Sequence, residues 1–118
     1  MTDQKPRVYQ DFYTPTFSKN YRKYQNIQNR IDDCLKEILS NPFAGTEALK
    51  HKAGFDLKGL RSARIDRNFR VIFCVWKEYQ RKSGKTLSLL PGYTRDRLTE
   101  TSVIFMTVGP HEKAYALK

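Results

Sequence analysis

Two apolar segments constrain the fold of this chain more than any other feature. Residues 69–76 and 103–108 are rich in β-branched and aromatic side chains, which favour strands. Residues 60–65 precede the first segment, separated from it by a short turn at residues 66–68, so we expect an antiparallel hairpin. The segment 69–76 is apolar enough to be a central strand of a sheet.

A helical region precedes these strands. Ser18 is a suitable N-cap, and from there apolar side chains recur every three or four residues up to Ile38, which is the period of a helix. The stripe fits either one helix or two helices joined near residues 25–26. Asn41 and Pro42 end it, because proline disfavours helix in the residue before it.

The remaining segments complete the expected layout. Residues 8–13 alternate as in a strand with one buried face, and Pro15 ends them. Residues 43–60 are predicted to be mostly loop with a short strand near the end. Residues 78–102 form a long, polar and basic insert, which in a compact domain is usually mobile or functional. A last strand over residues 103–108 follows.

This order of elements predicts an α+β fold. An N-terminal strand, a helical region and a three-stranded antiparallel meander form one sheet, with the helices on one face. The first strand must join that sheet for its apolar face to be covered. We therefore expect residues 1–118 to form one domain that carries a basic insert.

Charge narrows the class of partner. The chain has 118 residues with 22 Lys+Arg and 12 Asp+Glu, a formal charge of +10. Such an excess points to a polyanion: nucleic acid, an anionic membrane or an acidic protein. A membrane is the least favoured of these because no basic amphipathic helix is evident. No segment has the length of a membrane span, and the N-terminus lacks the apolar core of a signal peptide, so we expect a cytoplasmic protein.

The two cysteines point away from a disulfide or a metal. Cys34 lies in the helical region and Cys74 in a predicted strand, so both are expected to be small buried side chains. No pair of His or Cys residues has the spacing of a zinc site. We expect neither a metal nor another cofactor.

Six strings of the sequence, in their order and spacing, resemble the RelE/ParE superfamily of toxin-antitoxin toxins. They are residues 17–19, 39–43, 47–51, 57–60, 64–73 and 108–115. The resemblance as a whole extends over almost the entire chain outside residues 78–102. The resemblance implies a RelE-like microbial ribonuclease fold with two antiparallel helices. It is greatest to the RelE and YoeB-like branches, whose members cut mRNA in the ribosomal A site.

That reaction defines the groups to look for. The ribose 2′-OH attacks the adjacent phosphorus, which leaves a cyclic phosphate and a 5′-OH. The reaction needs a base for the 2′-OH proton, cations for the charge on the phosphoryl oxygens, and an acid for the leaving 5′-oxygen.

Arg70 is the first candidate for the phosphoryl oxygens. It lies among apolar residues of the predicted central strand, and a guanidinium offers paired donors that match a phosphate. The resemblance implies that an arginine in this string stabilises the transition state. Arg64, across the short turn, is expected to form a cationic pair with it. The alternative for both is an arginine on the solvent face of a strand.

Glu47 matches the carboxylate that acts as general base in YoeB-like toxins. Without the resemblance it is a solvated loop charge. If Glu47 is not the base, Lys50, His51 or Lys58 would act electrostatically, and these three are also candidate RNA-binding residues. Arg61 and Arg67 are candidates for RNA binding as well.

His111 and Tyr115 follow the last strand, where the resemblance implies a His or Tyr near the scissile phosphate. The ordinary pKa of histidine, about 6.5, suits acid-base chemistry at neutral pH. Tyr115 would hydrogen-bond a phosphate or stack on a base. The alternatives are an exposed tail histidine and a tyrosine that fixes the C-terminus to the core.

The resemblance thus implies a ribosome-dependent mRNA endoribonuclease, the toxin of a type II toxin-antitoxin system. Its expected partners are a cognate antitoxin, the ribosome and mRNA. Two alternatives remain: a ParE-like inhibitor of DNA gyrase that cleaves nothing, and an inactive RNA-binding homologue.

Overall fold

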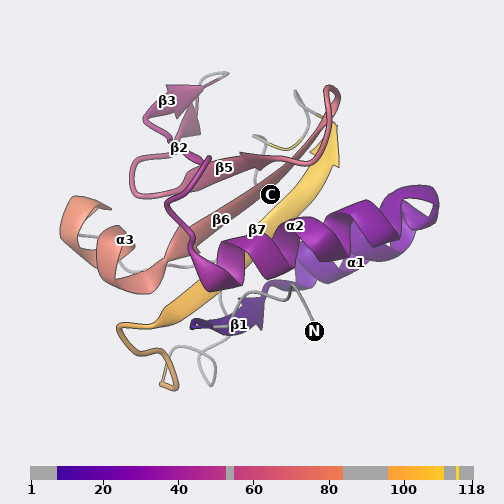
Figure 1. The fold of residues 1–118 in the computed structure, drawn as a ribbon. Helices are drawn as coiled ribbons and strands as arrows, with labels where there is room; N and C mark the ends of the chain where they lie inside the picture. The colour runs from indigo at the N-terminus through magenta and orange to yellow at the C-terminus, as the bar shows by residue number, and fades with distance from the viewer. Residues whose placement is uncertain (1–7, 53–54, 84–95, 111–113, 115–118) are drawn as a thin grey trace.

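A five-stranded sheet forms the centre of the protein, whose computed structural model describes residues 8–52, 55–83, 96–110 and 114 (Figure 1). The order of strands is β1-β7-β6-β5-β2. The strands are β1 (Gln10–Tyr13), β2 (Glu47–Ala48), β5 (Arg61–Arg64), β6 (Phe69–Val75) and β7 (Ser102–Pro110). The α+β class and the meander β5-β6-β7 are confirmed. Strand β1 joins the sheet as expected, but in parallel with β7, whereas the other pairs are antiparallel.

The helical region consists of two α-helices. Helix α1 (Pro15–Lys23) and helix α2 (Gln28–Ser40) are joined by a 3-10 turn, η1 (Gln25–Ile27), where the sequence left a junction open. The expected N-cap at Ser18 is wrong. Thr14 caps α1 instead: its Oγ1 accepts a hydrogen bond from the N–H of Phe17 at 3.0 Å. Pro15 starts the helix as well as ending the strand, because the first helical position needs no N–H donor.

Helix α1 continues along the edge of β7 that β1 leaves free. Strand β1 pairs only with the first four residues of β7, Ser102 to Phe105. Further along β7, the Thr14 hydroxyl donates to the carbonyl of Met106 at 2.6 Å, and the Asn20 amide donates to the Thr107 hydroxyl at 2.9 Å. Beyond them, a side chain at Gly109 would meet Tyr24, whose hydroxyl and ring would lie 3.7 Å and 3.8 Å from its Cβ. One end of α1 is therefore fixed beside the end of β7.

One face of the sheet packs against the two helices. Phe17 on α1 and Ile31 on α2 meet Phe73 and Phe105 from the central strands, and all four side chains are buried. The hydrophobic residues at helical spacing in α1 and α2 supply this cover, as the sequence predicts.

The second face has its own apolar cluster, which includes a helix that the sequence analysis missed. Helix α3 (Trp76–Ser83) directly follows β6, where a longer strand and the start of a structureless insert were expected. Trp76 and Tyr79 stack with ring centroids 6.2 Å apart, and both pack with Ile72 and Met106 of the sheet. Only two large apolar residues mark this helix, so its amphipathic pattern was too short to detect.

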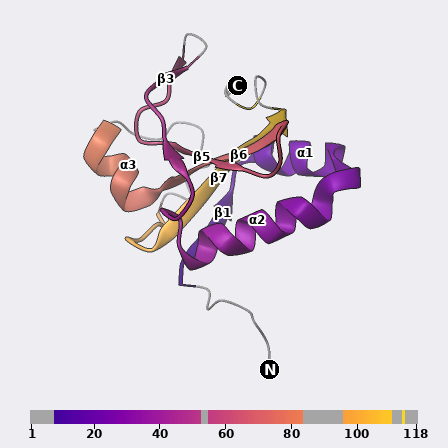
Figure 2. The ribbon, with the colours of Figure 1, turned by 45° about the horizontal axis from the view of Figure 1, so that its top comes forward.

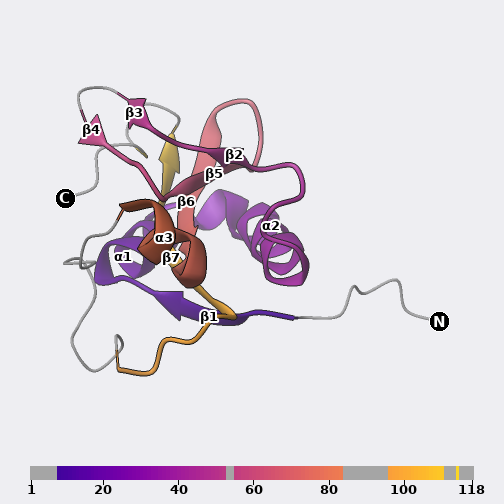
Figure 3. The same cartoon turned by 90° about the vertical axis from the view of Figure 1, so that its left-hand side faces the viewer.

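The segment 43–60 contains more strand than expected. Besides β2, a separate two-stranded hairpin is formed by β3 (His51–Lys52) and β4 (Phe55–Asp56). Figures 2 and 3 show this hairpin projecting from the sheet away from α2. Leu49 and Leu57, which flank it, are buried in the cluster of the second face.

Neither cysteine is in a disulfide. Cys74 is buried, Cys34 is half-buried, and both thiols are free. Burial raises the pKa of Cys34 to about 12 and raises that of Cys74 as well, so both are neutral thiols at physiological pH. Among the described residues, no helix has the length and hydropathy that crossing a membrane requires.

Candidate functional site

The candidate site lies at the end of the sheet where the turn between β5 and β6 is located. Arg64 and Arg70 are direct partners in the antiparallel ladder. The neighbouring hydrogen bond, from the N–H of Ile65 to the carbonyl of Phe69, makes Arg64 and Arg70 a non-hydrogen-bonded pair. Their Cβ atoms are then about 5 Å apart on one face of the sheet.

That face is the one opposite α2. Along β6 side chains alternate, and Val71 and Phe73 face the helices, whereas Ile72 and Cys74 belong to the second cluster. Arg70 therefore lies on the second face, one row beyond Ile72. Arg64 is exposed and Arg70 is half-buried. Like charges directly opposite each other are unfavourable, so this pair suits an anion bound between them.

The Arg70 guanidinium is held by the backbone of the turn. Its Nη1 donates to the carbonyls of Asp66 at 2.9 Å, Phe69 at 3.1 Å and Arg67 at 3.4 Å. Within the described part of the chain, Nε and Nη2 make no hydrogen bond. Nε and Nη2 form one paired edge of the guanidinium, whose two N–H groups have the geometry to match two oxygens of a phosphate.

Asp66 shapes the turn that holds Arg70. Its Oδ1 accepts from the backbone N–H groups of Asn68 at 2.8 Å and Phe69 at 3.0 Å. Its Oδ2 forms an ion pair with Arg30 of α2 at 3.2 Å. The hydrogen bond from Asn68, followed by those from Phe69 and Arg30, lowers the pKa of Asp66 below its ordinary value. The carboxylate form is thus favoured in the folded protein.

Glu47 lies on the same face, at the sheet edge. In β2 it pairs with Ser62, which precedes Arg64 by two residues on β5, and Ser62 in turn pairs with Ile72 of the second face. Diagonal neighbours of this kind have Cα atoms about 7 to 8 Å apart. Glu47 is exposed. Its carboxylate and the two arginines therefore border one stretch of surface.

The other expected RNA-binding residues differ in position. Lys50, Lys58 and Arg67 are exposed, the first two beside the β3–β4 hairpin and Arg67 in the β5–β6 turn. His51 lies in β3 with its side chain outside the described set.

Arg61 has a different environment from the one expected. It pairs with Phe73, so it lies on the helix-covered face. Its Nη1 donates to Glu78 of α3 at 2.9 Å, its Nε donates to the Thr46 hydroxyl at 3.0 Å, and its guanidinium lies 5.0 Å from the centroid of the Phe43 ring. With 11% of its side chain exposed, Arg61 is committed to this ion pair, and we leave it out of the RNA-binding surface.

His111 and Tyr115 lie outside the described residues. Pro110, the residue before His111, pairs with Phe69, and Gly109 pairs with Arg70. Ala114, the residue before Tyr115, is buried in the cluster of the second face. The roles of His111 and Tyr115 therefore remain predictions.

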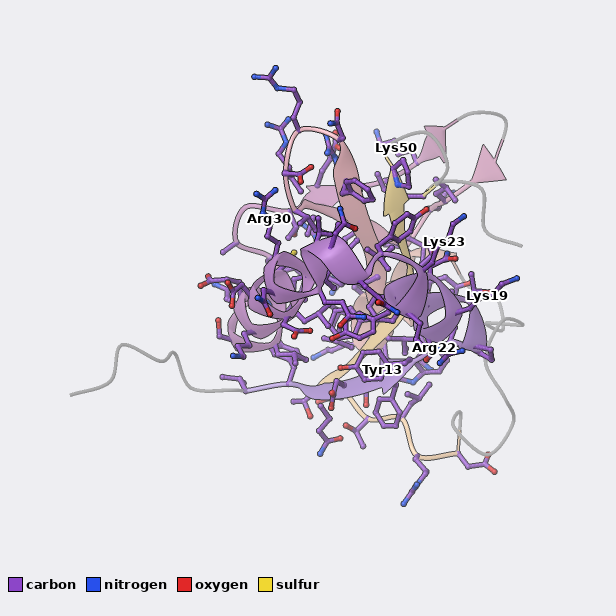
Figure 4. The ribbon with its side chains drawn as sticks, turned by 90° about the vertical axis from the view of Figure 1, so that its right-hand side faces the viewer. Tyr13, Lys19, Arg22, Lys23, Arg30 and Lys50 are labelled. Carbon is purple, nitrogen blue, oxygen red and sulfur yellow. The ribbon has the colours of Figure 1, made fainter. Side chains whose placement is uncertain are left out.

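Helix α1 adds cations that the sequence analysis did not single out. Lys19, Arg22 and Lys23 are exposed on α1, which carries no acidic residue. Figure 4 views the end of the molecule where α1 and α2 are joined, and it shows Lys19, Lys23 and Lys50 on one side and Arg30 on the other. Three basic residues within five positions of α1, with no acidic residue in the helix, were the signal in the sequence.

The described part of the site holds no arrangement typical of a metal centre. Among the described residues, no group of three or more His, Cys, Asp or Glu side chains is positioned to bind a metal ion. Its chemistry is that of paired guanidinium groups, lysines and a carboxylate.

Several solved structures share this architecture. The toxin–antitoxin complex RelBE2 from Mycobacterium tuberculosis has a chain that superimposes with a TM-score of 0.59 at 17% identity, covering 93% of this chain and 99% of that one. YafQ from Escherichia coli gives a TM-score of 0.59 at 15% identity, covering 91% of this chain and 98% of that one. A YoeB/ParE toxin from Agrobacterium tumefaciens gives 0.59 at 19% identity, covering 86% and 98%.

Sequence comparison alone finds no such relation. No protein-family model matches the chain, and no curated protein matches it. The identities to the solved structures are too low to transfer an activity, but the similarity extends over nearly the full length of each chain. The chain therefore has the fold of the RelE, YafQ and YoeB/ParE toxins.

Proposed function

We propose that this protein is the toxin of a type II toxin-antitoxin system and that it cleaves mRNA on the ribosome. The observation that carries the proposal is the Arg64–Arg70 pair, placed opposite each other on the second face of a RelE-type sheet. A gyrase inhibitor that acts by protein binding has no need of this pair. A nuclease needs cations where charge develops on the phosphoryl oxygens.

In this proposal Arg70 binds the scissile phosphate through its Nε and Nη2 edge, and Arg64 binds it from the neighbouring strand. Glu47 accepts the proton of the ribose 2′-OH, whose oxygen then forms a bond to phosphorus. The bond from phosphorus to the 5′-oxygen breaks, and His111 donates a proton to that oxygen. The products are a cyclic phosphate and a 5′-OH, and no metal takes part.

The surrounding cations bind the RNA. Lys50, Lys58 and Arg67 are exposed, and Lys23 at the C-terminal end of α1 adds charge on the side where Figure 4 shows Lys50. His51 and Tyr115 are proposed to contact RNA as well. Binding through phosphates releases counterions, so affinity for the ribosome should fall steeply as salt rises.

We further propose a cognate antitoxin as partner. RelBE2 is itself a toxin–antitoxin complex. A chain with a formal charge of +10 is complementary to an acidic partner that covers its basic face.

Controlled expression in growing cells tests the proposal. Wild type and Arg70→Ala are induced separately, and the 5′ ends of cellular mRNA are mapped. We expect growth arrest with new ends inside translated reading frames for the wild type alone. Growth arrest with intact mRNA and a DNA-damage response would instead identify a gyrase inhibitor.

A further inference from the structure

The turn between β5 and β6 is built around one carboxylate. Asp66 Oδ1 accepts two backbone hydrogen bonds, from Asn68 and Phe69, in the manner of an Asx turn. Without this acceptor the two N–H groups would need other partners, and the backbone of the turn would lose the interaction that fixes its curvature.

This curvature determines where three carbonyl oxygens point. The carbonyls of Asp66, Arg67 and Phe69 converge on a single nitrogen, Nη1 of Arg70. A lone arginine side chain has several rotatable bonds and loses considerable entropy when it is fixed. Here the turn supplies the fixation before any ligand arrives.

Because the turn holds Nη1, it determines which edge of the Arg70 guanidinium faces a ligand. Nη1 is occupied by the turn, whereas Nε and Nη2 have no partner among the described residues. These two nitrogens present the side-on pair of N–H groups that matches two oxygens of a phosphate. A ligand that meets a preoriented donor pair does not have to order it, which favours the transition state when the donors are aligned with it.

We propose that Asp66 is a positioning residue for Arg70. Through the backbone of the β5–β6 turn it holds Nη1 and leaves the Nε and Nη2 edge directed at the phosphate. The proposal rests on the proposed nuclease function, because it assigns Arg70 a phosphate as ligand. The Arg30 ion pair anchors the same carboxylate to α2, but among the described residues Arg30 forms no hydrogen bond with Arg70 or with the turn carbonyls.

Three substitutions separate the effect of the two backbone hydrogen bonds that Asp66 accepts from the effect of its negative charge. Asp66→Ala removes both the backbone acceptor and the ion pair. Asp66→Asn keeps an acceptor oxygen for Asn68 and Phe69 but removes the charge. Arg30→Ala removes the ion pair and leaves the two backbone hydrogen bonds to Asp66 in place. Thermal unfolding of each variant identifies any that does not fold, and Asp66→Ser, which keeps one acceptor oxygen, then replaces Asp66→Ala.

The first measurement is steady-state cleavage of ribosome-bound mRNA over a range of substrate concentrations. We expect kcat for Asp66→Ala to fall about 10-fold to 100-fold with KM nearly unchanged, because misplacement of a catalytic donor by about 1 Å has effects of this size. Asp66→Asn and Arg30→Ala should stay within about threefold of wild type, the size of a small electrostatic effect at an exposed pair. Wild-type kcat in a folded Asp66→Ala would overturn the proposal, and so would a loss in Asp66→Asn equal to that in Asp66→Ala.

The second measurement needs no cleavage. In ¹⁵N-labelled protein at low temperature, the Nη1–H signals of Arg70, identified by their absence in Arg70→Ala, report how firmly the turn carbonyls hold the guanidinium. We expect their hydrogen exchange to be about tenfold faster in Asp66→Ala than in wild type, and unchanged in Asp66→Asn, since one lost hydrogen bond corresponds to about that factor. If wild type cleaves no mRNA, the nuclease function fails, and this exchange experiment still decides whether Asp66 positions Arg70.

Discussion

The two ends of the β5–β6 ladder both carry arginines, and the two environments differ. At one end, Arg61 is buried against Glu78 of α3 and Thr46. At the other end, Arg64 and Arg70 face each other on the second face, and Arg70 keeps one guanidinium edge without a partner in the described residues. The same residue type thus stabilises the fold at one end and, in the proposed function, binds a phosphate at the other.

The difference comes from what packs against each end. Helix α3 brings Glu78 to Arg61, and that carboxylate has only 7% of its side chain exposed. The turn at the opposite end brings backbone carbonyls to Arg70, which orient a guanidinium without neutralising it. The role of an arginine on a strand therefore depends on the groups packed against it, and the residue type alone does not reveal it.

The largest expected effect is on the rate of mRNA cleavage. It arises at the open end of the β5–β6 ladder, by which we mean the end that carries Arg64 and Arg70. Arg70→Ala should reduce the rate of mRNA cleavage by about 10²-fold to 10³-fold, as loss of a donor to a developing oxyanion does. Arg67→Ala, in the same turn but exposed, is the matched control and should weaken binding with kcat nearly unchanged. Equal losses in the two variants would show that Arg70 acts only as a general RNA contact.

The second effect is on the free energy of unfolding. It arises at the buried end of the ladder, where Arg61 pairs with Glu78. Arg61→Ala should lower the free energy of unfolding by about 3 kcal/mol or more, because it leaves the buried Glu78 carboxylate without its main partner. The remaining partner, Lys82 at 3.4 Å, is itself partly exposed. Urea denaturation measures the change. Arg64→Ala, at the exposed end, should stay within about 0.5 kcal/mol of wild type, and a similar loss in both variants would remove the contrast between the two ends.

A third effect tests whether the open end also supplies a general base, Glu47, or only the positive charge of its arginines. Glu47→Gln should lower kcat about 10²-fold if its carboxylate accepts the 2′-OH proton, because the amide has no basic oxygen. Glu100→Gln changes a carboxylate that is 80% exposed on another part of the surface, and it should leave kcat unaltered. If Glu47→Gln cleaves at the wild-type rate, Glu47 is not the general base, and Lys50 or Lys58 would then assist the reaction through their positive charge.

The smallest effect concerns the pH dependence of the turn. The pKa of Asp66 is lowered in the folded state from the ordinary 3.8, so its carboxylate stabilises the fold above that value, and this contribution is lost as pH falls through the lowered pKa. Wild type should therefore be more stable than Asp66→Asn at pH 7 and pH 5, and the difference should shrink below about pH 4. Urea midpoints at these pH values measure it. A difference that stays constant down to pH 2 would contradict this assignment of the carboxylate.

The central strands could be predicted because their signal is local. Residues 69–75 and 102–110 are buried over most of their length, and a run of apolar side chains indicates this without knowledge of the neighbours. The pairing of Arg64 with Arg70 also follows from the sequence, since a short turn leaves few possible registers.

The roles of Arg61 and Asp66 could not be predicted in the same way. Arg61 owes its ion pair to α3, a helix marked by only Trp76 and Tyr79, and without that helix the arginine is indistinguishable from its neighbours on β5. Asp66 precedes Asn68 in a recognisable turn sequence, but only the structure shows that the turn carbonyls converge on Arg70.

The chemistry of the cut ends tests the account most directly. Purified protein is mixed with ribosomes that hold a defined mRNA, and the termini of the products are identified. We predict cleavage only on the ribosome, with a cyclic phosphate on the upstream fragment and a 5′-OH on the downstream one, and no cleavage by Arg70→Ala. A 5′-phosphate on the downstream fragment, or intact mRNA beside a fully folded wild-type protein, would contradict it.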